Sequence, residues 1–93
     1  MSSGERWPEQ RLVACLAPGD GGVAFVAGRG VGKAVQRNRA RRLLRAAWDV
    51  VGREVREGVD IVLIARRGIL QSGSGEAARD LEATLRRAGA LRR

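Results

Sequence analysis

The sequence predicts a small α+β domain in which two helices pack against a sheet, and three observations lead to this fold class. Two apolar segments, residues 11–16 and 23–27, flank a turn rich in Pro and Gly. Apolar residues then recur at helical spacing over 33–57, and a run rich in β-branched residues follows at 59–65. A second helical pattern covers 76–88. The order strand, strand, helix, strand, helix favours a sheet with helices over it.

The first elements of the domain are expected to form a β-hairpin. Residues 1–10 contain few apolar side chains and are predicted to be a loose lead-in to a single domain over 11–91. The turn between the first two strands, residues 18–22, is only a few residues long. Because short connections favour antiparallel neighbours, we expect the strands at 11–16 and 23–27 to pair with each other.

The long helix is predicted to begin at Lys33, after a glycine-rich segment, and to end near Glu57. One apolar stripe runs along it at spacings of three and four residues, formed by Ala40, Leu44, Trp48, Val51 and Val55. Gly52 costs about 1 kcal/mol relative to alanine inside a helix. Its presence there indicates a bend or close packing.

The remaining elements are a strand and a helix. The strand at 59–65 is almost entirely apolar, so we expect it to be central and buried on both faces. A loop over 71–75 leads to the helix at 76–88, with Ser74 as the expected N-cap. The apolar positions of this helix are Ala78, Leu81, Leu85 and Ala88.

The composition restricts the classes of function. The 93 residues include 18 Lys and Arg against 10 Asp and Glu, a formal net charge of +8, which favours an anionic partner. There is no histidine, which excludes zinc sites with imidazole ligands and acid–base catalysis by histidine. The single Cys15 cannot form an internal disulfide. No apolar run is long enough to span a membrane and no secretory signal is visible, so we expect a cytoplasmic protein without catalytic or metal-binding residues of its own.

The most informative segment is residues 32–45, GKAVQRNRARRLLR, which holds six cations and no acid. A solvated basic face is the alternative interpretation, but such faces usually contain interspersed glutamates. Arginines four residues apart on a helix repel one another, as here at Arg37, Arg41 and Arg45. The segment therefore predicts a surface for an external anion, above all nucleic acid. Asn38 between two arginines could add hydrogen bonds to a base edge or a ribose hydroxyl.

Two other interpretations of this region are disfavoured. A P-loop would need glycine at Ala27 and Ser or Thr at Ala34, and the dinucleotide-binding pattern fails at Lys33. Phe25 and Trp48 could stack on bases, but both lie in apolar patterns, so we expect them to pack in the core.

The segment 31–45 closely resembles the signature of the bacterial ribonuclease P protein component. In that family Gly-Lys-Ala-Val is followed by Arg-Asn-Arg, a basic pair and a further Arg; here these are 32–35, 37–39, 41–42 and Arg45. Residues 60–66 are similar to the buried strand of the family at the expected distance, and the resemblance covers roughly 12–91. Trp48 stands where the family usually has Phe.

The sequence departs from the family pattern near its start. Members normally begin with an extra helix that carries Phe and basic residues, and nothing similar precedes Arg11. We expect that the true start lies upstream of Met1; the alternative is a divergent member. Gly30 stands where the family commonly has a second Lys. Ala14 lies near a position where the first strand of the family often carries an aromatic residue. Without the extra helix, one face of the sheet is expected to be under-covered.

The resemblance implies both a fold and a role. The implied fold resembles domain 2 of ribosomal protein S5, with a left-handed strand–helix–strand crossover. The implied role is that of the protein subunit of ribonuclease P, bound one to one to a large catalytic RNA and contacting the 5′ leader of precursor tRNA. In the family the RNA, with bound Mg²⁺, performs the hydrolysis, so the protein is expected to hold no cofactor and to be inactive alone.

Two other classes of nucleic-acid-binding protein are alternatives to this role. A ribosomal or ribosome-assembly protein that binds structured RNA without processing it is the main alternative. A DNA-binding module is disfavoured because no helix-turn-helix spacing is visible.

The expected RNA contacts fall into two sets by their angular separation on the helix. The set expected to face the leader is Arg37, Asn38, Arg41 and Arg45. The set expected to contact the catalytic RNA is Arg29, Lys33, Arg39 and Arg42.

Overall fold

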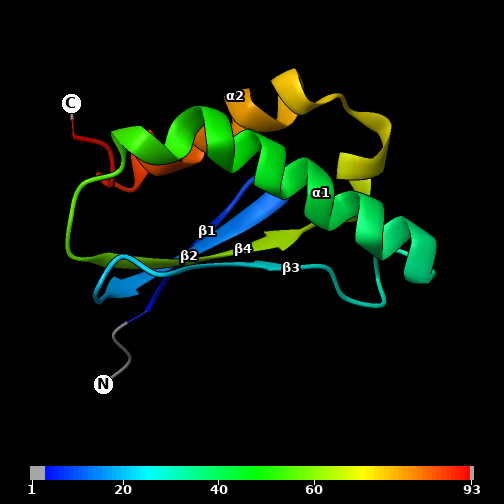
Figure 1. Ribbon diagram of the computed structural model, residues 1–93, viewed down its shortest axis with the longest axis horizontal. Helices are drawn as coiled ribbons and strands as arrows, with labels where there is room; N and C mark the ends of the chain where they lie inside the picture. Colours follow the sequence, from blue (N-terminus) through cyan, green and yellow to red (C-terminus); the bar gives the residue numbers. More distant parts are fainter. Residues whose placement is uncertain (1–3, 93) are drawn as a thin grey trace.

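The computed structural model describes residues 4–92 and places two helices over one face of a four-stranded sheet (Figure 1). The strands are β1 (Glu5–Pro8), β2 (Leu12–Pro18), β3 (Val23–Val26) and β4 (Val59–Ala65). The helices are α1 (Ala34–Val51) and α2 (Ser74–Arg87), with short 3₁₀ segments at Gly52–Glu54 and Arg67–Gln71. The α+β class is confirmed, with one strand more than predicted.

The pairing of the strands differs from the prediction. The order in the sheet is β1-β2-β4-β3, antiparallel except for the parallel pair β3 and β4. The predicted hairpin is therefore wrong: β4 lies between the two segments, and β2 pairs instead with β1, which comes from the predicted lead-in. The long, apolar β4 buries more of its surface between two strands than at an edge, and this outweighs the short connection between β2 and β3.

Burial within β4 is one-sided. In β4, Ile61 and Leu63 are 2% and 0% exposed and belong to the core beneath the helices, whereas Val62 is 36% exposed. The prediction that this strand is buried on both faces is therefore wrong, because in the described part of the chain both helices lie on the same side (Figure 1). The expected under-covered face is present, and Val26 of β3 also lies exposed.

Helix α1 uses the predicted apolar stripe but ends earlier than expected. Ala40, Leu44 and Val51 are buried, while Trp48 and Val55 pack against the core from partly buried positions. The helix stops at Val51 rather than near 57. A Cβ on Gly52 would lie 2.6 Å from Cε2 of Trp48, so the indole ring occupies the space that a side chain would need. The close packing predicted at this glycine is confirmed.

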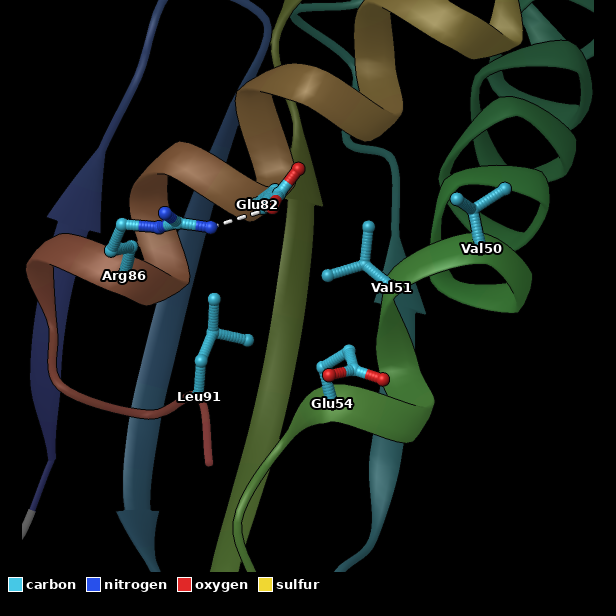
Figure 2. Close-up of a pocket in the computed structure, with 6 residues that line it drawn as sticks. All are labelled: Val50, Val51, Glu54, Glu82, Arg86 and Leu91. Atoms are coloured by element: carbon cyan, nitrogen blue, oxygen red, sulfur yellow. Dashed lines mark hydrogen bonds and ion pairs between the residues drawn. The ribbon is translucent and has the colours of Figure 1, made fainter. Parts of the chain in front are cut away.

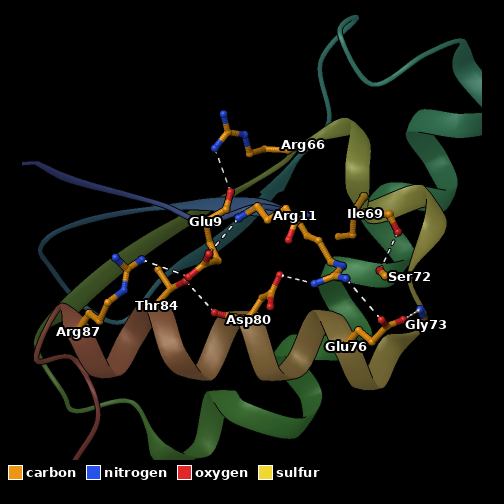
Figure 3. Close-up of polar contacts among 11 residues, drawn as sticks. Glu9, Arg11, Arg66, Ile69, Ser72, Gly73, Glu76, Asp80, Thr84 and Arg87 are labelled. Carbon is orange, nitrogen blue, oxygen red and sulfur yellow. Dashed lines mark hydrogen bonds and ion pairs between the residues drawn. The ribbon is translucent and has the colours of Figure 1, made fainter.

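Helix α2 is held to the start of β2 by charge. Arg11 forms ion pairs with Asp80 at 3.0 Å and with Glu76 at 3.4 Å (Figure 3). The hydrogen bond that Arg11 donates to Asp80 raises the pKa of Arg11 above its ordinary value. The N-cap is Gly73 rather than the predicted Ser74, and the Gly73 N–H donates to Oε1 of Glu76 at 3.0 Å. Glu76 and Asp80 thus both have partners within the protein.

Gly52→Ala tests the packing of Trp48. Helix propensity alone predicts a gain of about 1 kcal/mol from alanine, whereas overpacking against the indole ring costs about 1 to 3 kcal/mol. We expect urea denaturation to show a lower free energy of unfolding for this variant. The control is Gly75→Ala in the first turn of α2, where an added Cβ has no neighbour within 4 Å, and stability should hold or rise. Equal gains from both substitutions would contradict the account of Gly52.

Candidate nucleic-acid interface

The turn before α1 is fixed by its own backbone. The Val31 N–H donates to the Gly28 carbonyl at 3.1 Å, and the Gly32 N–H donates to the Arg29 carbonyl at 3.2 Å. Val31 itself is 3% exposed and anchors the turn in the core. These contacts leave the side chain of Arg29 exposed on a defined loop.

The first turn of α1 requires glycine at position 32. Gly32 has φ +147°, and a Cβ there would lie 2.1 Å from Oε1 of Gln36. The same Gln36 oxygen accepts a hydrogen bond from the Lys33 N–H at 2.7 Å, which satisfies a donor at the helix start. Lys33 is exposed, and its side chain extends from a fixed end of the helix.

Helix α1 carries its cations on the sides that the core does not use. The buried side is formed by Ala40, Leu44, Ala47 and Val51. At about 3.6 residues per turn, Arg37, Arg41 and Arg45 follow one flank of this stripe. Arg39 lies on the opposite flank and is exposed. The helix therefore presents arginines over a wide sector, with their backbone positions fixed by packing behind them.

Four of the predicted residues meet around one surface hollow of about 280 Å³, lined by Asn38, Arg41, Arg42 and Arg45. Oδ1 of Asn38 accepts a hydrogen bond from Nη2 of Arg41. The hollow joins three members of the predicted leader set to Arg42 of the other set. Their separation into two faces therefore does not hold at Arg42, because residues three and four apart are neighbours on a helix surface.

The other predicted residues lie outside this hollow. Arg37 is half-buried beside the stripe, and Arg39 is exposed on α1. Arg29 and Lys33 lie in the preceding turn.

Within residues 4–92, no acid forms an ion pair with any cation of the segment 33–45. The ion pairs of the described chain connect Arg11, Arg86 and Arg87 to acids of α2 or of the β1–β2 connection. The positive potential of α1 is therefore left for an outside anion to neutralise.

Arg66 and Arg67 form a basic site that the sequence did not predict. They line a second hollow of about 280 Å³ at the carboxyl ends of β3 and β4, together with Gly28, Gly30, Val31, Ile64 and Ala65. Nη1 of Arg66 donates to the Glu9 carbonyl at 2.9 Å (Figure 3). The sequence contains this basic pair after a strand, but only the parallel pairing of β3 with β4 places it beside the loop of Arg29.

A third hollow, of about 360 Å³, lies between α2 and the end of α1, and it has a different character (Figure 2). Its lining includes the apolar Val50, Val51 and Leu91 and the carboxylates of Glu54 and Glu82. Glu82 accepts a hydrogen bond from Arg86 at 2.6 Å. Two carboxylates disfavour a phosphate, so we do not count this hollow in the interface.

Among residues 4–92, no three His, Cys, Asp or Glu side chains are grouped so that they could hold a metal ion. No helix in the same range is both long and apolar enough to cross a membrane.

Comparison with known proteins identifies relatives of this chain. The family model described as Ribonuclease P matches residues 1–89. The chain is 46% identical over 71 residues to the ribonuclease P protein component of Symbiobacterium thermophilum, covering 76% of this chain and 62% of the relative. It is 35% identical over 97 residues to the ribonuclease P protein component of Paramagnetospirillum magneticum, covering 95% of this chain and 73% of the relative.

A third relative and two solved structures agree with these matches. The component from Gluconacetobacter diazotrophicus is 47% identical over 68 residues, covering 72% of this chain and 59% of the relative. Against two of the three relatives, this chain thus spans about three fifths of their length. The RNase P protein of Staphylococcus aureus superposes with a TM-score of 0.75 at 22% identity, covering 95% of this chain and 84% of that chain. The RNase P protein of Thermotoga maritima superposes with a TM-score of 0.75 at 23% identity, covering 90% of this chain and 83% of that chain.

The solved structures bear out the fold, and the family model and curated relatives bear out the resemblance carried by the segment 31–45. The chain belongs to the bacterial ribonuclease P protein family.

Proposed function

We propose that this protein is the protein subunit of ribonuclease P, which binds a catalytic RNA and promotes removal of the 5′ leader from precursor tRNA. The observation that carries the proposal is the acid-free row of cations on α1, without a counter-charge among the described residues, in a member of this family. An external polyanion supplies the missing charge, and RNA in the cytoplasm is the partner that fits.

The proposed contacts centre on the hollow lined by Asn38, Arg41, Arg42 and Arg45 and include the exposed cations beside it. Arg37, Asn38, Arg41 and Arg45 contact the leader of the precursor. Arg29, Lys33, Arg39 and Arg42 contact the catalytic RNA, with Arg42 at the border between the two sets. The hollow of Arg66 and Arg67 extends this basic surface beyond the loop of Arg29.

In this proposal the protein does not perform the bond cleavage. The catalytic RNA, with Mg²⁺ that it binds, supplies the phosphodiester hydrolysis. The chain contributes cations that neutralise phosphates, an amide at Asn38 that can hydrogen-bond ribose or base, and rigid positions for both. One protein is expected per RNA. The polypeptide alone should cleave no precursor.

Reconstitution tests the proposal directly. The purified protein is added to the ribonuclease P RNA of its own organism at low Mg²⁺, and the rate of precursor tRNA cleavage is measured. We expect stimulation, because neutralised phosphates reduce the repulsion that otherwise requires more Mg²⁺. Binding to structured RNA without any stimulation would indicate the alternative, a ribosomal or assembly protein.

Arg41→Ala and Arg45→Ala test the leader contacts. Each lost phosphate contact should reduce the slope of log affinity against log salt by about 0.7 to 0.9. Affinity for precursor tRNA should fall, while affinity for mature tRNA without a leader should change less. The matched control is Arg79→Ala, an exposed arginine of α2, which should leave both quantities unchanged. An unchanged salt slope for Arg41→Ala and Arg45→Ala would show that these residues do not contact phosphates.

A further inference from the structure

The side chain of Arg45 is held by an aromatic ring from the sheet. Its guanidinium carbon lies over the ring of Phe25 in β3, 5.2 Å from the ring centroid. Phe25 is only partly buried, at the edge strand, and it packs against the core as the sequence predicted. The ring therefore has a second contact that the sequence did not predict.

The opposite side of this guanidinium is available to a ligand. Arg45 is exposed, and no described acid forms an ion pair with it. A guanidinium is planar and delocalised and can stack on an aromatic system, which a lysine ammonium cannot do in the same way. Unpaired bases of RNA are recognised by stacking on arginine planes as well as on aromatic rings.

The surroundings of Arg45 suit the rest of a nucleotide. The hollow that Arg45 lines also contains Asn38 and Arg41. Because Oδ1 of Asn38 accepts from Arg41, the amide NH₂ of this exposed residue is left as a donor. A base on Arg45 would thus have a cation for its phosphate and an amide for its ribose nearby.

We propose that Arg45, positioned by Phe25, is a stacking platform for one unpaired nucleobase of the bound RNA. Phe25 acts as a positioning residue and Arg45 as the contact. This inference rests on the proposed RNA-binding function and adds that the surface of α1 binds a base as well as phosphates.

The test compares two single-stranded polymers of equal length and charge. One is a ten-nucleotide oligoadenylate, and the other is the abasic ribose-phosphate polymer of the same length. Affinities of the full chain for both are measured by fluorescence anisotropy over a range of salt concentrations. Since one stacked base contributes about a factor of ten or more, we expect the wild type to prefer oligoadenylate by about tenfold.

Variants assign this preference to the proposed pair. Arg45→Lys keeps the charge and should lose most of the preference while its salt slope stays unchanged. Phe25→Leu keeps an apolar side chain in the core and should show the same loss, whereas Phe25→Tyr should restore the preference. The control Arg79→Lys on α2 should behave as wild type.

The outcomes separate this inference from the proposed function. Equal binding of both polymers by the wild type, or full preference in Arg45→Lys, would overturn the stacking site and leave phosphate binding intact. Failure of the wild type to bind either polymer at low salt would overturn the stacking site together with the phosphate contacts proposed for a single strand on α1, while the subunit role is tested separately by reconstitution.

Discussion

The structure depends on α1, which packs into the core with one side and presents arginines on its other sides. One side of this helix is part of the core, through Leu44 and its buried neighbours, and so the helix cannot rotate or shift. The other sides carry arginines that repel one another at four-residue spacing. Packing holds these like charges together, and in the described part of the chain no acid relieves them. A surface of this kind is stable when an anion from outside binds to it, which links the packing of the core to the proposed binding of RNA.

The sheet determines what lies next to that surface. Because β4 takes the central position, β3 becomes an edge strand beside α1, and Phe25 comes to lie below Arg45. The parallel pairing of β3 with β4 also brings Arg66 and Arg67 to the loop that precedes the helix. Meanwhile Glu76 and Asp80 of α2 pair with Arg11, which lies between α2 and the start of β2 (Figure 3). These two acids therefore form ion pairs with Arg11 and not with the cations of α1.

The sequence was informative wherever the signal was local. Helical periodicity predicts the buried side of α1, the charge pattern predicts the exposed arginines, and Gly52 indicates a bend or close packing, which the structure shows to be packing against Trp48. The hairpin was predicted wrongly because a short connection favours pairing only when no better strand competes, and β4 lies 33 residues or more beyond β3 in the chain. The strand β1 was missed since its apolar content is low. Arg66, Arg67 and the contact between Phe25 and Arg45 require the sheet order, which no local pattern contains.

The central claim is that the cations of α1 serve an external partner at a cost to the free protein. The most direct measurement is the free energy of unfolding of Arg41→Gln by urea at low salt, beside its affinity for RNA. Removing this charge relieves repulsion from Arg37 and Arg45, so stability should rise by about 0.4 to 1 kcal/mol, less in 1 M salt, while RNA affinity falls. A variant that is less stable than the wild type, with RNA affinity unchanged, would show that this arginine serves the fold and would contradict the account.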